Sequence, residues 1–280
     1  MSEVKTDEVW GLALSGGGAR GAYQYGVWRS LQETPLIDHF KVIGGTSIGA
    51  INAVLFTQEQ ITGEPVARQF WEELDLSYIF AALPEGTTEL GVVDYLRLGW
   101  DGIQNLGIRI DPLKEWLRAH LKPDVLEESD RIVWANTWDL FKFREETRRY
   151  PGSDPDVFVE WVLGSASFPF FGPHQYKGRY LLDGGIANNL PLHLVFQESA
   201  VQQVLAIDLA TFMRYHPRQI MLERKYGHQT HFLRVGLDLP SPASFSRSSV
   251  DLMIERGRAD ALAWWEERSA VDAARDLDAT

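Results

Sequence analysis

The pentapeptide Gly45–Gly49 reads G-T-S-I-G and places Ser47 between two glycines. It follows the apolar run Lys41–Thr46, which is typical of a buried strand, and precedes AINAVLF, which is typical of a helix. A strand, a sharp turn and a helix form the context in which a nucleophilic serine stands at the tip of a strained turn. The alternative is a glycine-rich turn with an incidental serine. The strand–helix context favours the nucleophile, with Gly45 and Gly49 relieving crowding in the turn.

A second glycine cluster, SGGGARG, spans residues 15–21 and opens a helical pattern. Its G-x-G-x-x-G spacing is also that of dinucleotide-binding loops, which need an acidic residue at the end of the next strand. Here that strand ends in Gly-Gly-Thr-Ser, and the nearby acid, Asp38, lies before it. If the two strands are neighbours, both glycine turns lie at one carboxyl edge of the sheet. We therefore expect Gly16–Gly18 to face Ser47 and to hold an oxyanion rather than a pyrophosphate.

A serine nucleophile needs a base that accepts its proton. The histidines have no obvious partner in the sequence, and an α/β-hydrolase arrangement would put several strands before the nucleophile, where this chain has one. Asp183 is the other candidate, because it ends the short strand Tyr180–Leu182 and is followed by Gly184 and Gly185. Alone, Asp-Gly indicates a tight turn. Together with the two upstream motifs it indicates a base, and Asp208, after another apolar strand, is the reserve candidate.

Positioning these residues requires a sheet. Six short apolar runs are expected strands: Val9–Leu14, Lys41–Thr46, Arg131–Thr137, Tyr180–Leu182, Gln203–Ile207 and His231–Leu237. Several are unbroken rather than alternating, which indicates strands covered on both faces. Helical patterns fall between them, including two that begin at Asp111-Pro112 and Asp154-Pro155, where the aspartate can cap and the proline suits the first turn. This alternation predicts an α/β layer fold with a mainly parallel sheet.

Length and composition fit a single domain over residues 1–280, since 45% of the residues are hydrophobic and a chain of this size can bury a substantial core. Residues 59–110 are weakly patterned and are interpreted as an insertion or lid, and residues 268–280 as a polar tail or a loose helix. The aromatic stretches FPFF and AWW are interpreted as core rather than as a lipid-facing rim. FREETRR is interpreted as a solvated face.

Several classes of function are excluded or disfavoured. The formal net charge of −12 argues against general nucleic-acid binding. The absence of cysteine excludes thiolate chemistry, and no cluster of histidines and carboxylates indicates a metal site, so we expect neither a metal nor a cofactor. The N-terminus has no apolar signal segment, and no run approaches the roughly 20 apolar residues of a membrane span. We expect a cytoplasmic protein that can be peripheral at a membrane.

The three motifs, in this order, resemble those of the patatin-like phospholipases. That family has a G-G-G-x-R/K-G loop, then G-x-S-x-G, then D-G-G/A, and here these are Gly16–Gly21, Gly45–Gly49 and Asp183–Gly185. GSASFPFFGP, at Gly164–Pro173, resembles the family's A-S-x-x-P region, and NNLPL after the aspartate fits as well. The resemblance covers residues 9–210, extends weakly further, and implies a three-layer α/β/α fold.

The resemblance also implies a Ser–Asp dyad without histidine. Ser47 would attack an acyl carbonyl, Asp183 would accept its proton and return it to the leaving alcohol, and water would then release the acyl group. The expected oxyanion donors are the N–H groups of Gly17 and Gly18, joined by Gly16 or Ala19. The other motif residues would support the turns: Arg20, Gly21, Gly45, Gly49, Gly184 and Gly185.

Arg20 has two interpretations: it draws a lipid phosphate or braces the loop, or it pairs with a nearby carboxylate. The expected function is hydrolysis of carboxylic esters in phospholipids or lysophospholipids, with transient contact to a membrane surface. One alternative is a neutral-lipid or small-ester esterase or an acyltransferase. Another is a non-catalytic nucleotide- or lipid-binding module, which would be signalled by loss of Ser47 or Asp183, and neither is lost.

Overall fold

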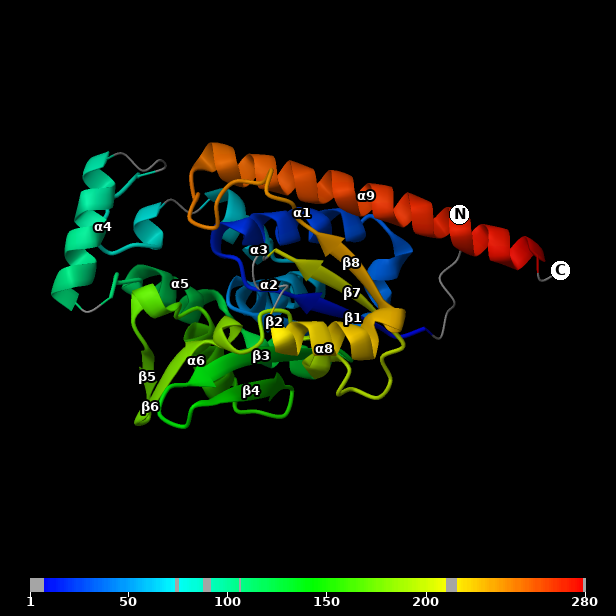
Figure 1. The fold of residues 1–280 in the computed structure, drawn as a ribbon, viewed down its shortest axis with the longest axis horizontal. Coiled ribbons are helices and arrows are strands. Elements are labelled where there is room, and N and C mark those ends of the chain that lie inside the picture. Colours follow the sequence, from blue (N-terminus) through cyan, green and yellow to red (C-terminus); the bar gives the residue numbers. More distant parts are fainter. Residues whose placement is uncertain (1–7, 74–75, 88–91, 106, 210–215, 279–280) are drawn as a thin grey trace.

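Figure 1 shows the computed structural model of the chain, which describes residues 8–73, 76–87, 92–105, 107–209 and 216–278. An eight-stranded sheet lies at its centre in the order β5-β6-β3-β2-β1-β7-β8, with β4 paired to β3. The strands are β1 (Trp10–Leu14), β2 (Phe40–Thr46), β3 (Ile132–Asp139), β4 (Arg144–Tyr150), β5 (His174–Tyr176), β6 (Arg179–Asp183), β7 (Gln203–Asp208) and β8 (Thr230–Arg234). The pairings among β8, β7, β1, β2 and β3 are parallel, whereas β4, β5 and β6 join through antiparallel pairings.

Helices cover both faces of this sheet. They are α1 (Gly21–Leu31), α2 (Ile48–Thr62), α3 (Val66–Arg68), α4 (Val92–Asn105), α5 (Asp111–His120), α6 (Pro155–Ser165), α7 (Leu192–Val195), α8 (Pro217–Tyr226) and α9 (Arg247–Asp278). Leu12 and Leu14 of β1 join the larger core with residues of α1, α2, α6 and α9. Ala13, which points the opposite way, joins a smaller core with α7 and α8. The predicted α/β/α layers and mainly parallel sheet are confirmed.

The six predicted strands are present, and the structure adds β4 and β5. Most of FREETRR forms β4, which pairs with β3 from Asp139↔Arg144 to Val133↔Tyr150. A strand this rich in charge carries no apolar signal of its own, because pairing with a buried neighbour sets its conformation. At α6 the predicted cap is confirmed, since the Asp154 carboxylate accepts the N–H of Val157. Helix α5 differs, because Asp111 is its first residue rather than its cap.

Of the two interpretations of the polar end, the helix is the one found, because residues 268–278 belong to α9, a helix of 32 residues. Figure 1 shows α9 lying along α1 over much of its length. Two glycines allow this close approach: a Cβ on Gly26 would lie 2.0 Å from the carbonyl oxygen of Ile254, and one on Gly257 would lie 2.1 Å from that of Tyr23. Packing of α9 against α1 is therefore a tertiary contact, and the polar sequence at the end of the chain does not predict it.

Segment 59–110 packs against the main core in the part that the structure describes. Phe70, Trp71 and Phe80 are buried there, while α4 projects from the body at the left of Figure 1. Whether this segment moves as a lid stays a prediction. Among the described residues, no helix is both long enough and apolar enough to cross a membrane.

The interpretation of the aromatic stretches as core is correct for one of them. In AWW, Trp264 and Trp265 are partly buried and pack against the main core. In FPFF the interpretation is wrong for Phe168 and Phe170, which are exposed, whereas Phe171 is partly buried and packs against the main core. Apolar composition could not tell these cases apart, since exposure depends on what packs over a segment.

Candidate active site

Ser47 lies between β2 and α2 in a strained backbone conformation. Its φ of 57° and ψ of −129° are unusual for a residue that carries a side chain. The flanking glycines are required by close backbone contacts: a Cβ on Gly45 would lie 2.1 Å from the carbonyl oxygen of Gly49, and one on Gly49 would lie 2.3 Å from that of Leu14. The strand, turn and helix around Ser47 thus form the elbow that the sequence predicts.

Asp183 reaches the elbow through the antiparallel part of the sheet. It pairs with Thr137 of β3, while Asn136, the preceding residue of β3, pairs with Thr46 of β2. The Asp183 carboxylate accepts the N–H of Gly185 at 2.7 Å, and the Ser47 side chain lies close enough to it to lower its pKa. The structure therefore brings together the two side chains that the sequence predicts as nucleophile and base.

Burial sets the proton affinity of this carboxyl group. Only 3% of Asp183 is exposed, and desolvation raises its pKa to about 6, although the Ser47 side chain and the hydrogen bond from Gly185 act in the opposite direction. A carboxylate with this pKa is a stronger base than an ordinary aspartate and is still ionised at neutral pH. It is therefore suited to take a proton from the neighbouring Ser47 hydroxyl.

The C-terminal end of α6 and the residues that follow it contact both Ser47 and Asp183. The buried Ser165 hydroxyl accepts the N–H of Ser47 at 2.7 Å and donates to the carbonyl oxygen of Asn136 at 2.6 Å. Two residues later, the carbonyl oxygen of Ser167 accepts the N–H of Asp183 at 2.9 Å. The sequence drew attention to GSASFPFFGP but not to this role, because a serine hydroxyl that reaches a distant backbone N–H leaves no local pattern.

We expect Ser165→Ala to lower kcat by about tenfold to a hundredfold with little change in KM. The substitution leaves the N–H of Ser47 without its acceptor, so the strained turn loses a contact that fixes the nucleophile. Steady-state kinetics on a short, soluble ester would measure the effect. Ser167→Ala is the matched control, since its hydroxyl donates only within the end of α6, to Leu163, and the carbonyl group that holds Asp183 stays in place. Equal losses in both variants would contradict this role for Ser165.

The glycine loop lies against the elbow, and it offers fewer free donors than expected. A Cβ on Gly16 would lie 2.8 Å from the Cβ of Ser47. The N–H of Gly16 donates to the carbonyl oxygen of Asn189 at 3.1 Å, and that of Ala19 to Pro242 at 2.8 Å. These two are therefore wrong as oxyanion donors, because their N–H groups already hold the loop in place.

Gly17 and Gly18 supply the remaining N–H groups of the loop. Within the described part of the chain, neither N–H has a hydrogen-bond acceptor. Gly18 has a φ of +55°, and a Cβ there would lie 2.4 Å from the carbonyl oxygen of Pro242, so this position requires glycine. Two adjacent free donors at the start of a helical segment suit a developing oxyanion.

The Arg20 side chain holds this loop in place. It is buried, and its guanidinium donates to the carbonyl oxygens of Pro240 at 2.8 Å, Leu209 at 3.1 Å and Leu239 at 3.3 Å. A planar fork of donors suits three carbonyl groups on two separate segments. Of the earlier interpretations of Arg20, these contacts favour the one in which it braces the turn.

The other candidate bases have partners elsewhere. Asp208 forms an ion pair with Arg234 at 3.7 Å. His174 hydrogen-bonds to Glu160 at 2.6 Å. Because Asp208 and His174 already have partners, the geometry agrees with the choice of Asp183 over Asp208 as the base.

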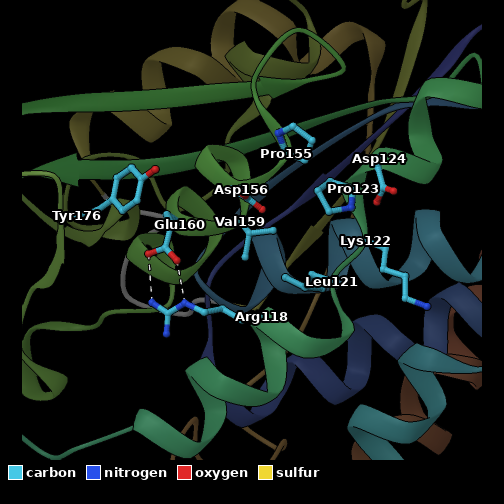
Figure 2. Close-up of a pocket in the computed structure, with 10 residues that line it drawn as sticks. All are labelled: Arg118, Leu121, Lys122, Pro123, Asp124, Pro155, Asp156, Val159, Glu160 and Tyr176. Atoms are coloured by element: carbon cyan, nitrogen blue, oxygen red, sulfur yellow. Dashed lines mark hydrogen bonds and ion pairs between the residues drawn. The ribbon is translucent and has the colours of Figure 1, made fainter.

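A cavity of about 620 Å³ lies between the end of α5 and the first half of α6. Figure 2 shows that Arg118 and Glu160 face each other on its wall, joined by hydrogen bonds of 2.8 and 3.2 Å, with Tyr176 on the far side of Glu160. Its described lining contains no residue of the three motifs, and Ser165, which contacts Ser47, lies at the other end of α6. This cavity is therefore separate from the dyad.

Comparison with known proteins shows which family model the chain matches. Residues 12–196 match the family model described as patatin-like phospholipase. Patatin-like phospholipase domain-containing protein 7 of Rattus norvegicus is 26% identical over 226 residues, which cover 75% of this chain and 14% of that protein. An uncharacterized NTE family protein of Mycobacterium tuberculosis is 30% identical over 203 residues, covering 71% of this chain and 30% of that protein. The chain thus spans less than a third of the length of these two relatives.

Solved structures share the fold at low sequence identity. VipD from Legionella pneumophila has a TM-score of 0.57 and 14% identity, over 95% of this chain and 68% of that one. Human GIVD cytosolic phospholipase A2, in complex with methyl gamma-linolenyl fluorophosphonate, has a TM-score of 0.50 and 12% identity, over 97% and 60%. These likenesses concern the arrangement of helices and strands.

Proposed function

The chain belongs to the patatin-like phospholipase family, and from that premise we propose that it hydrolyses carboxylic esters of lipids, with phospholipids or lysophospholipids as the substrate class. The observation that carries the proposal is the buried Asp183, which lies beside Ser47 at a strained elbow next to the free N–H groups of Gly17 and Gly18. These are the three parts that acyl transfer to a serine requires: a nucleophile, a base and an oxyanion site.

The reaction begins when the Ser47 oxygen attacks the acyl carbon while its proton passes to the Asp183 carboxylate. The carbonyl oxygen becomes an oxyanion, which the N–H groups of Gly17 and Gly18 stabilise. Collapse of this intermediate breaks the ester bond, and Asp183 returns the proton to the leaving alcohol. Water then attacks the acyl-serine with Asp183 again as base, which releases the fatty acid and restores the Ser47 hydroxyl.

The rate should depend on pH through Asp183. Because its pKa is raised to about 6, we expect kcat/KM on a short, soluble ester to be constant above that pH and to fall about tenfold for each pH unit below it. An ordinary surface aspartate would give this fall near pH 4 instead. A pH–rate profile at constant ionic strength measures the midpoint, and a profile that stays flat down to about pH 4 would contradict a base with this raised pKa.

Labelling with a fluorophosphonate, followed by intact-mass measurement and a panel of lipids, tests the function itself. We expect one adduct on the wild type, none on Ser47→Ala, and free fatty acid released from phospholipid or lysophospholipid. Activity confined to neutral lipids or small esters, or transfer of the acyl group to an added alcohol, would favour an esterase or an acyltransferase. If the folded protein is not labelled and NAD or ATP raises its melting temperature, the hydrolase proposal is wrong and a binding module is favoured.

A further inference from the structure

The hairpin that joins β3 and β4 ends in two exposed aromatic side chains. Residues Leu140–Phe143 join the two strands, and Asp139 and Arg144 pair across the base. We call the tip of this hairpin, residues 141–144, the Phe141–Arg144 turn. Phe141 and Phe143 are 68% and 75% exposed, which is unusual for aromatic side chains of this size. Phe143 has a φ of +49°, so the turn also holds a bulky residue in the left-handed region.

The turn is built rigidly. One carboxylate oxygen of Asp139 accepts the N–H groups of Phe141 at 3.2 Å and Lys142 at 3.0 Å, and the other accepts the guanidinium of Arg179 at 2.7 Å. The Phe141 ring also packs edge-on against Tyr180, with ring centroids 4.9 Å apart. The aromatic side chains are therefore held out by a network of contacts, which is expected of a surface that receives a partner.

Charge around the turn is distributed unevenly between its surface and its interior. Four cations surround two carboxylates in this network: Lys142, Arg144, Arg148 and Arg179 around Asp139 and Glu146. Both carboxylates are buried, whereas the side chains of Lys142 and Arg144 are 49% and 64% exposed. The network thus has an excess of two positive charges and presents its cations outward, although the chain as a whole carries −12. This complements an anionic surface.

The turn lies close to the dyad along β3. Asp183 is paired with Thr137, and the residues that join β3 and β4 begin three positions further on, which corresponds to about 10 Å of strand. A second exposed loop with Phe168 and Phe170 directly follows Ser167, whose carbonyl oxygen holds the N–H of Asp183. A surface that binds the Phe141–Arg144 turn would therefore be within reach of the reaction that we propose.

We propose that the Phe141–Arg144 turn docks the protein on an anionic lipid surface, with the two phenylalanines entering the headgroup region and Lys142 and Arg144 contacting the negative headgroups. Alternating aromatic and cationic residues on a rigid tip suit such an interface, where rings leave water and cations meet phosphates. The inference deepens the proposed lipid hydrolase function and rests on it for the choice of a lipid surface over a protein partner.

Co-sedimentation with vesicles tests this docking. The intact chain is mixed with vesicles of phosphatidylcholine alone and of phosphatidylcholine with phosphatidylglycerol. We expect stronger binding to the anionic vesicles, weakening as salt is added. Lys142→Gln/Arg144→Gln should weaken that binding by about fivefold for each charge removed. Phe141→Ser/Phe143→Asn should weaken binding to anionic vesicles by about tenfold or more, and asparagine tolerates the positive φ at position 143.

Met221→Ser on α8 is the matched control, because Met221 is also exposed but lies on the face covered by α8. Hydrolysis of a short, soluble ester by each variant shows that the dyad is intact. Equal binding by the wild type and all variants, or no binding to anionic vesicles, overturns the docking surface. A dimer that forms without lipid and is lost in the phenylalanine variant would also overturn it, in favour of a contact between two copies. Vesicle binding without ester hydrolysis would instead mark failure of the proposed function.

Discussion

Replacing Ser47 with alanine should lower ester hydrolysis by about 10⁴-fold or more. In the proposed mechanism the serine oxygen forms the bond to the acyl group, so no other group at the site can take over its part. Fluorophosphonate labelling should disappear with the activity. Hydrolysis by the purified Ser47→Ala variant at a tenth of the wild-type rate would place the nucleophile elsewhere.

The same position allows a test that does not depend on activity. Ser47 has a φ of 57° and a ψ of −129°, a conformation that glycine adopts without the Cβ penalty. We therefore expect Ser47→Gly to be more stable than Ser47→Ala by about 1 kcal/mol in urea unfolding. Equal stability of the two variants would show that the elbow is not strained, and the inactivity of both would still be expected.

Asp183→Asn should lower kcat by about 10³-fold, since an amide accepts a hydrogen bond from Ser47 but cannot take its proton. The side chain keeps its size and can still accept the N–H of Gly185. Labelling by a fluorophosphonate should be slowed rather than abolished, because the nucleophile and the oxyanion donors are still present. A variant that keeps most of its kcat would contradict the role of Asp183 as the base.

The same substitution should make the protein more stable at neutral pH. The pKa of Asp183 is about 6 in the folded chain and near 4 when unfolded, so between these values the folded state binds more protons. The contribution of Asp183 to stability is therefore fully present below about pH 4 and is lost as the pH rises through 6. Asparagine does not titrate, so Asp183→Asn should gain stability relative to the wild type as the pH rises, by up to about 3 kcal/mol.

Thermal or urea unfolding of both proteins at about pH 4.5 and about pH 8 would measure this difference. We expect the two curves to lie closer at the acidic pH and the variant to be the more stable at the alkaline one. If the wild type is the more stable protein at both pH values, burial of the ionised Asp183 carboxylate does not destabilise the folded chain. Reduced activity with raised stability in one variant is typical of a residue kept for chemistry.

The sequence by itself predicted Ser47 as the nucleophile, Asp183 as its base, and the layer fold. G-T-S-I-G and S-G-G-G-A-R-G are local patterns, because sharp turns next to strands require glycines at fixed offsets whatever the rest of the chain does. The strands around them are continuous apolar runs, which identify a sheet covered on both faces. Asp183 was predicted from its place at a strand end together with the upstream motifs, and the folded chain brings it beside Ser47, while its role as the base stays a prediction.

Tertiary structure alone decided which groups are free and which are already used. Gly16 and Ala19 belong to the same loop as Gly17 and Gly18, yet their N–H groups bind carbonyl oxygens contributed by residues more than 150 positions away. Ser165 likewise fixes Ser47 across 118 residues. The exposure of Phe141 and Phe143 and the course of α9 depend in the same way on distant neighbours. A sequence pattern reports the preferences of adjacent residues, whereas hydrogen bonding and burial depend on atoms that only the folded chain brings together.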